Sequence, residues 1–224
     1  MIPFKDDNPA SIFPFITIAI IALNAIVLLM QITSPYGQQK IAFSYGAIPN
    51  LLLTLKTYQP IHPILTVFTS MFMHGGIFHL GGNMLYLWIF GNNIEDRLGH
   101  FRFLIFYIVC GVIAAYSHAL AEPASQTPMI GASGAVSGVL GAYLLLFPHA
   151  KIHTLVFLGF FVNVIRLPAM LVIGFWVVIQ FLNGIISKGV AGQGGVAWFA
   201  HVGGFIAGFL LIKLFLYTKK DIYY

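Results

Sequence analysis

Long apolar runs recur along this chain, separated by short stretches that carry most of its few charged residues. A helix that crosses a bilayer needs about 20 mostly apolar residues, and several of these runs reach that length. Of the 224 residues, 59% are hydrophobic and only 8% are charged, whereas an average soluble domain carries roughly 25% charged residues. Because so few charged side chains cannot cover a soluble globule, the chain is predicted to be an integral membrane protein.

The same composition excludes a soluble enzyme, a disordered protein and a nucleic-acid-binding domain. The net charge of +5 does not indicate a nucleic-acid partner, because the cations are scattered singly along the chain. The single cysteine, Cys110, cannot form an internal disulfide. Because the composition is that of a membrane protein, the lipid bilayer is the first expected partner. The sequence leaves the oligomeric state open.

The apolar runs predict an all-α fold with six membrane-spanning helices in one domain, 1–224. The charged cluster at 95–97 is taken to close the second span. The first run is interpreted as a retained span, because it is too long for a signal peptide and lacks a strongly basic leader. The expected spans are 12–31, 77–93, 103–120, 133–147, 168–186 and 196–217.

Two connections are unusually apolar. The run 152–165 has 14 residues, which as a helix would measure about 21 Å and could not cross a core of about 30 Å. It is predicted to be an interfacial or re-entrant segment with both ends on one side. The longest connection, 34–76, is predicted to lie partly in the outer leaflet.

The distribution of lysine and arginine predicts the orientation. With the N-terminus in the cytoplasm, eight cations fall on inner segments and three on outer segments. Cytoplasmic segments carry the excess of positive charge in membrane proteins. Both termini are therefore predicted to be cytoplasmic in a multi-pass protein of the cell membrane.

Three predicted spans begin with polar residues: His79 and Asn83 in the second, Ser133 in the fourth and His201 in the sixth. Polar side chains within a membrane are costly and usually face the bundle interior or a water-filled cavity. All four lie within about two turns of the outer end of their helix. His79 and Asn83 share a helix face, because they are four residues apart. One site near the outer surface is predicted.

These residues have the chemistry of an acyl-transfer site. A serine needs a base to remove its proton, and histidine is the usual one. His79, Asn83 and the backbone N–H of Ser133 could donate hydrogen bonds to an oxyanion. Because no Asp or Glu lies in these spans, a dyad is expected rather than a triad. Without a carboxylate or second cysteine beside the histidines, no metal and no cofactor is expected.

Each motif also has a simpler interpretation. The small residues at 131–135 are typical of close helix packing. His201 could be a packing-face histidine, and His79 with Asn83 could be a hydrogen-bonded pair. An ion or proton pathway is the alternative that would use all of them together.

At these residues the sequence resembles the rhomboid family of intramembrane serine proteases. The tract 69–76 and the turn 95–99 are also similar to rhomboid sequence. The resemblance implies a six-transmembrane-helix rhomboid bundle with a long, membrane-associated first outer loop and a cavity open to the outer side. The matching motifs are His79-x-x-x-Asn83, Gly131-x-Ser133-Gly134 and Ala200-His201-x-x-Gly204.

By this resemblance, Ser133 is the nucleophile and His201 the general base and acid. The scissile carbonyl would be polarised by His79 and Asn83. Family members often carry an aromatic residue four positions after the serine, stacked on the histidine, whereas this chain has Ser137. His201 must then be positioned by another group. The residues with implied supporting roles are His74, Gly131 and Gly134.

The expected function is a serine-type endopeptidase that cleaves transmembrane segments of membrane proteins near the outer face. Peptide carbonyls in a spanning helix are hydrogen-bonded, so the substrate must unwind locally. Substrates are expected to carry helix-destabilising residues and a small residue before the cleavage site. The alternatives are a transporter or channel and a non-catalytic rhomboid-like protein that binds client membrane proteins. The non-catalytic kind normally lacks the serine or the histidine, and this chain has both.

Overall fold

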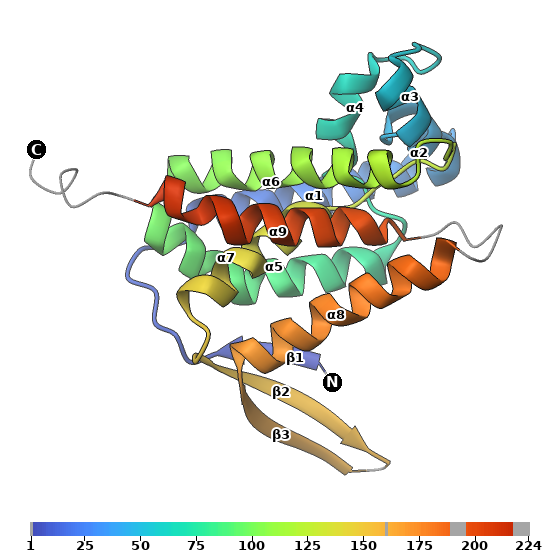
Figure 1. Cartoon of the computed structure of the whole chain (residues 1–224). Helices are drawn as coiled ribbons and strands as arrows, with labels where there is room; N and C mark the ends of the chain where they lie inside the picture. The colour runs from blue at the N-terminus through green and yellow to red at the C-terminus, as the bar shows by residue number, and fades with distance from the viewer. Residues whose placement is uncertain (1, 160, 189–195, 217–224) are drawn as a thin grey trace, which may run out of the picture.

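The computed structural model describes residues 2–159, 161–188 and 196–216, and most of them are helical (Figure 1). Within the described residues, helices lie over all six predicted spans. In chain order the elements are β1 (Ile2–Asp6), α1 (Phe15–Thr33), α2 (Gln38–Tyr45), α3 (Pro49–Thr54), α4 (Pro63–Ser70), α5 (Ile77–Leu98), α6 (His100–Ala121), α7 (Ser133–Leu146), β2 (Lys151–Leu158), β3 (Phe161–Pro168), α8 (Ala169–Lys188) and α9 (Trp198–Phe215).

Four helices in the described part of the chain, α1, α6, α8 and α9, are long and apolar enough to cross a membrane. Helix α7 is apolar but has 14 residues. Helix α5 has 22 residues, and its last turns carry the charged cluster at 95–97, which lowers its hydropathy. The chain is a mostly helical, multi-pass membrane protein.

Helix α5 continues beyond residue 93 because Glu95 is buried against α1 rather than solvated. Its carboxylate accepts hydrogen bonds from the backbone N–H groups of Ile16 and Thr17, each at 2.8 Å, and from the Thr17 hydroxyl at 2.7 Å. The first N–H groups of a helix have no partner within the helix. Glu95 therefore caps the start of α1 and fastens it to α5.

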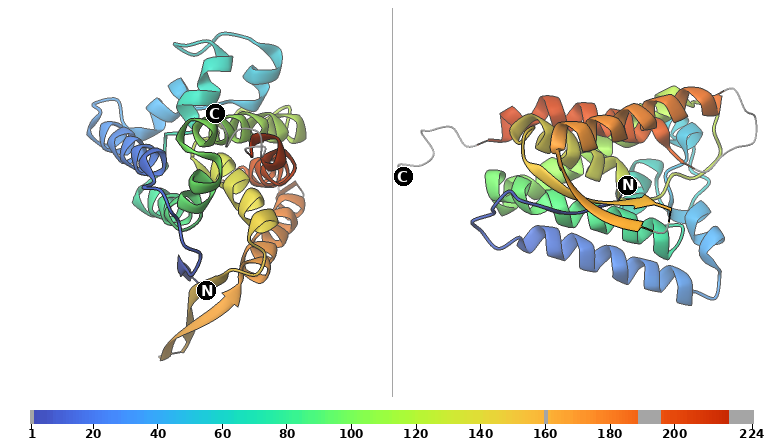
Figure 2. Two further views of the ribbon diagram at one scale, coloured as in Figure 1. Left: turned by 90° about the vertical axis from the view of Figure 1, so that its left-hand side faces the viewer. Right: turned by 90° about the horizontal axis from the view of Figure 1, so that it is seen from below.

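Helix α7 lies at the centre of the bundle and packs against α5, α6 and α9 (Figure 2). Its contact with α9 is close because glycines face each other: Gly138 lies against Gly208, and Gly134 against Gly204. Small residues allow membrane helices to approach backbone to backbone. The packing interpretation therefore holds for Gly134, on the same helix that begins with Ser133.

This close approach predicts that Gly208→Ala destabilises the bundle. A Cβ at position 208 would overlap backbone atoms of Gly138, and overpacking of this kind typically costs about 1–3 kcal/mol. Thermal unfolding of the purified protein in detergent measures the loss. Gly174→Ala on α8 is the matched control, since a Cβ there meets no atom within 4 Å. Equal melting temperatures for both variants would contradict the packing account.

Residues 151–168 form a β-hairpin, so the expectation of an all-α fold is wrong here. Strands β2 and β3 pair antiparallel from Lys151 opposite Pro168 to Leu158 opposite Phe161, and β1 pairs with the other edge of β2. Gly159 occupies the turn with a φ of +62°, which glycine adopts without a steric penalty. The run is rich in β-branched and aromatic residues, which suit strands. Its two ends do lie side by side.

Side-chain contacts at its C-terminal end, from Asp6 and from Asp7 just after it, hold β1 in place. The Tyr143 hydroxyl of α7 donates to the Asp6 carboxylate at 2.5 Å, and His153 of β2 lies 2.6 Å from the Asp7 carboxylate. The hydrogen bond from His153 holds the pKa of Asp7 below its ordinary value. The N-terminal strand is thus fastened to both the bundle and the hairpin.

The connection between α1 and α5 contains the short helices α2, α3 and α4, which project together at one end of the molecule (Figure 1). Apolar side chains such as Leu53, Leu65 and Phe68 are exposed on them. Backbone hydrogen bonds between Ala47 and Met129 join this connection to the segment that precedes α7. Helices α5 and α9 begin at the same end, which brings the predicted site residues to one level.

Candidate active site

Ser133 and His201 are in direct hydrogen-bond contact. Ser133 is the first residue of α7, and His201 lies in the first turn of α9. The Nε2 atom of His201 is 2.7 Å from the Oγ atom of Ser133. His201 is 9% exposed, and the glycine-mediated packing of α7 on α9 brings the two side chains together. A histidine at this distance can take the hydroxyl proton.

Gly131 keeps a space open beside this pair. Its φ of +130° is one that side-chain-bearing residues rarely adopt. A Cβ at Gly131 would lie 2.9 Å from Nε2 of His79 and 3.5 Å from Oγ of Ser133, so both atoms flank the same small volume. The Gly75 N–H donates to Nδ1 of His79 at 3.3 Å. An Nδ1 that accepts places the ring proton of His79 on Nε2, toward this space.

Asn83 is buried one turn after His79 on α5 and is held by His74. Its Nδ2 atom is 3.0 Å from Nε2 of His74. The backbone of His74 is itself fixed, because its N–H and carbonyl both bond to the Gln31 side chain of α1 at 3.0 and 3.2 Å. His74, itself held by Gln31, therefore fixes the position of the Asn83 side chain by a hydrogen bond.

A cavity of about 360 Å³ joins these groups. Its walls come from α5, α7, α8 and α9, and it receives the side chains of Ser133, His201, His79 and Asn83. Polar groups that converge on a mostly apolar cavity are typical of a binding or catalytic site. Of the predicted residues, Gly134 packs between helices instead, against Ala114 and Gly204.

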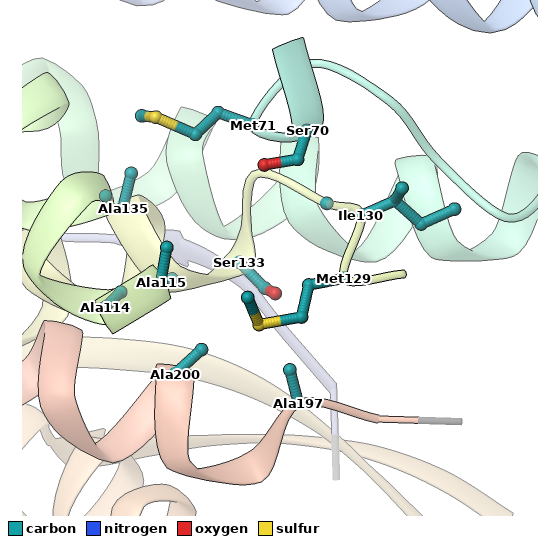
Figure 3. A pocket seen from close by; sticks show the side chains of 13 residues that line it. Ser70, Met71, Ala114, Ala115, Met129, Ile130, Ser133, Ala135, Ala197 and Ala200 are labelled. Carbon is teal, nitrogen blue, oxygen red and sulfur yellow. The ribbon is translucent and has the colours of Figure 1, made fainter. Parts of the chain in front are cut away.

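A second, smaller cavity of about 40 Å³ also borders Ser133. Figure 3 shows the Ser133 side chain among small side chains from α6 and α9. Such a volume accommodates a group no larger than a small side chain. The residues that line it are Ser70, Met71, Gly111, Ala114, Ala115, Met129, Ile130, Gly131, Ser133, Gly134, Ala135, Ala197 and Ala200.

The side chains around the His201 ring were not anticipated from the sequence. Oε1 of Gln180, on α8, is 2.7 Å from Nδ1 of His201. The rings of Trp176 and Trp198 lie 5.9 and 6.1 Å from the imidazole, centroid to centroid. The sequence did contain a signal for this contact, because Gln180 is a polar residue in the otherwise apolar middle of α8 and such residues usually have a partner.

Ser137 does not take over the stacking role of an aromatic residue. Its hydroxyl donates to the backbone carbonyl of Ser133 at 2.5 Å, one turn back in α7.

In the part of the chain that the structure describes, no group of three or more His, Cys, Asp or Glu residues is placed to hold a metal ion.

The fold and site together define a helical multi-pass membrane protein in which a serine and a histidine meet beside an internal cavity. The family model of the Rhomboid domain matches residues 62–218, and the chain belongs to the rhomboid family.

Named relatives agree with this membership. RHOMBOID-like protein 1 of Arabidopsis thaliana is 31% identical over 163 residues, which cover 73% of this chain and 37% of the relative. Rhomboid protein 1, mitochondrial, of Saccharomyces cerevisiae is 41% identical over 97 residues, 42% of this chain and 28% of the relative. Rhomboid protease GluP of Bacillus subtilis is 29% identical over 141 residues, 63% of this chain and 25% of the relative. The chain thus spans less than half the length of each.

Proposed function

We propose that this chain is an intramembrane serine endopeptidase that uses Ser133 and His201 as a catalytic dyad. The observation that carries the proposal is the 2.7 Å contact between Nε2 of His201 and Oγ of Ser133 at the wall of a cavity. Membership of the rhomboid family supports it, as does the name of the Bacillus subtilis relative, a rhomboid protease.

The proposed reaction is acyl transfer in two halves. His201 Nε2 takes the hydroxyl proton as Ser133 Oγ attacks the carbonyl carbon of the scissile peptide. The protonated imidazole then gives this proton to the leaving amine as the C–N bond breaks, which leaves an acyl-enzyme. A water molecule, deprotonated by the same imidazole, then attacks the ester carbonyl. The imidazolium returns this proton to Ser133 Oγ as the ester C–O bond breaks and the new carboxyl terminus leaves.

The oxyanion of each tetrahedral intermediate would lie in the space beside Gly131. The ring proton of His79 lies on Nε2, on the side of this space. The Ser133 N–H is at a helix N-terminus, where backbone donors lack partners within the helix. An asparagine amide has two donors, so Asn83 keeps one for the oxyanion while the other bonds to His74. Preorganised donors of this kind stabilise developing negative charge.

The topology belongs to the same proposal. Helices α5 and α7 complete six spans with α1, α6, α8 and α9, and both termini lie in the cytoplasm. The cavity then opens to the outer side of the cell membrane, and the short helices α2 to α4 rest in the outer leaflet on exposed side chains such as Leu65 and Phe68. A location near the membrane surface would give water access to the acyl-enzyme.

The proposed substrates are transmembrane segments with helix-destabilising residues and a small residue before the cut. A substrate strand that reaches Ser133 must leave its helix, since helical carbonyls are already hydrogen-bonded. The cavity of about 40 Å³ beside Ser133, with alanines in its wall, supports a small side chain at this position.

The substrate proposal predicts that stabilising the substrate helix slows cleavage. A substrate with glycine or proline near the outer end of its span is compared with a leucine-rich variant in proteoliposomes. Because the leucine variant must pay more to unwind, its cleavage is expected to be slower at equal substrate density. Equal rates would contradict the requirement for unwinding.

The function itself is tested by incubating membranes with wild-type or Ser133→Ala protein and sequencing the new protein termini. We expect new termini only with the wild type. Solute flux into liposomes without covalent labelling of Ser133 by a fluorophosphonate would instead favour a transporter or channel. Capture of membrane proteins without new termini would favour a client-binding protein.

A further inference from the structure

Gln180 joins the dyad to a third helix. Its side-chain oxygen lies 2.7 Å from Nδ1 of His201, the ring nitrogen that does not face Ser133. Both side chains are buried, with 8% of Gln180 and 9% of His201 exposed. We propose that Gln180 is a positioning residue that fixes the tautomer and orientation of His201, an inference that rests on the proposed function.

The chemistry of the imidazole explains why this contact matters. A neutral imidazole carries one proton, so one ring nitrogen donates while the other accepts. His201 can remove the Ser133 proton only when Nε2 accepts, and the ring proton must then be on Nδ1. An acceptor at Nδ1 selects this tautomer, and the carbonyl oxygen of the Gln180 amide provides it. The opposite tautomer would donate to Ser133 and could not act as its base.

The immediate surroundings assign this role to α8. Trp176 lies one turn before Gln180 on the same helix face and packs beside the imidazole, at 5.9 Å between ring centroids. The Ser137 hydroxyl, one turn after Ser133 on α7, bonds to the Ser133 carbonyl rather than to the imidazole. The same α8 face therefore both bonds and packs against the histidine.

An amide at Nδ1 affects the protonated imidazole differently from the carboxylate of a Ser-His-Asp triad. A carboxylate beside Nδ1 stabilises the imidazolium that forms during reaction. An amide is uncharged and takes no proton, so Gln180 orients the ring without adding a charge. It also remains satisfied when His201 becomes protonated, because Nδ1 donates in both states.

Two substitutions separate orientation from packing. Gln180→Met keeps the length of the side chain but removes the acceptor, whereas Gln180→Glu keeps an acceptor oxygen at the same reach. With the Nδ1 donor left unpaired, Gln180→Met is expected to lower kcat roughly 5- to 150-fold at unchanged KM. Fluorophosphonate labelling of Ser133 should slow in parallel. Gln180→Glu should lose less of both rates.

The matched control is Asn183→Leu, which removes an amide from the next turn of α8. The described hydrogen bonds of the His201 ring go to Gln180 and Ser133, so this variant is expected to keep wild-type kcat. Melting temperatures of all variants are measured in the same detergent. A structural role for Gln180 predicts that labelling follows the folded fraction and that the charged variant, Gln180→Glu, is the worse of the two.

The outcomes distinguish this inference from the function on which it rests. If wild-type protein shows Ser133-dependent cleavage and Gln180→Met matches it, the positioning role is overturned and the protease assignment stands. If wild-type protein shows neither Ser133-dependent cleavage nor labelling, the proposed function is overturned, and the positioning role with it. Loss of kcat in folded Gln180→Met, with partial rescue in Gln180→Glu, supports both.

Discussion

Ser133→Ala is expected to abolish proteolysis while the protein stays folded and inserted in the membrane. Without Oγ no acyl-enzyme can form, and loss of the nucleophile in a serine protease costs about 10⁶-fold in kcat. His201→Ala is expected to cost a similar factor, because Oγ would lose the base 2.7 Å away. The rate of cleavage of a membrane-inserted reporter in proteoliposomes is the measurement.

Ser137→Ala is the matched control for this experiment. Ser137 lies one turn further along α7, and its hydroxyl bonds only to the carbonyl of Ser133 among the described contacts. A serine that bonds back to its own helix contributes little to stability, so near-normal turnover is expected. Cleavage by purified Ser133→Ala protein at the wild-type rate would falsify the assignment.

The double variant Ser133→Ala with His201→Ala adds a second check. Because the two groups act as one unit, the double variant is expected to be no slower than either single variant. A multiplicative loss would show that His201 contributes through something other than the proton of Ser133, such as substrate binding. Fluorophosphonate labelling of His201→Ala distinguishes these, since it reports the nucleophilicity of Ser133 without a peptide substrate.

The helices of this fold could be predicted because the bilayer imposes their length. Spans of apolar residues mark α1, α6, α8 and α9 directly. That α5, α7 and α9 begin at the same end of the bundle follows from their order along the chain. The hairpin at 151–168 could not be predicted, because a short apolar run does not distinguish a strand from a helix.

The role of Glu95, solvated or buried, could not be predicted either. A charge near a helix end is usually solvated, and only the packing of α1 on α5 shows that it is a buried cap.

The contact between Ser133 and His201 was within reach of sequence reasoning, because a polar residue in a membrane helix needs a partner. Gln180 satisfies the same rule, yet it was missed because it belongs to no recognised motif. Its partner depends on the rotation of α8 about its axis, which apolar periodicity does not specify for a helix that is apolar on its other sides as well. The two glycine roles were also inseparable in sequence: Gly131 is needed for its backbone angle, and Gly134 for packing.

Asn83→Ala is expected to lower kcat about 10²- to 10³-fold, roughly 2.7–4 kcal/mol, by removing one donor from the developing oxyanion. Weak cleavage should persist, because His79 and the Ser133 N–H remain, and Ser133 should still be labelled slowly. Since the donors share one negative charge, the double variant with His79→Ala need not be additive. Single-turnover rates with a membrane-inserted substrate measure the chemical step.

The structure also offers a competing role, because Asn83 bonds to His74 at 3.0 Å and could simply tie α5 to the preceding loop. Asn93→Ala supplies the comparison: Asn93 is a buried asparagine of the same helix whose amide donates to the Asn8 carbonyl at 2.9 Å, away from the cavity. Removal of a structural tie should lower the melting temperature and spare kcat, as expected for Asn93→Ala. If Asn83→Ala behaves in the same way, Asn83 is a structural residue and the oxyanion depends on His79 and the helix N-terminus alone. If kcat falls while the melting temperature stays near that of wild type, the second amide proton of Asn83 acts in the transition state.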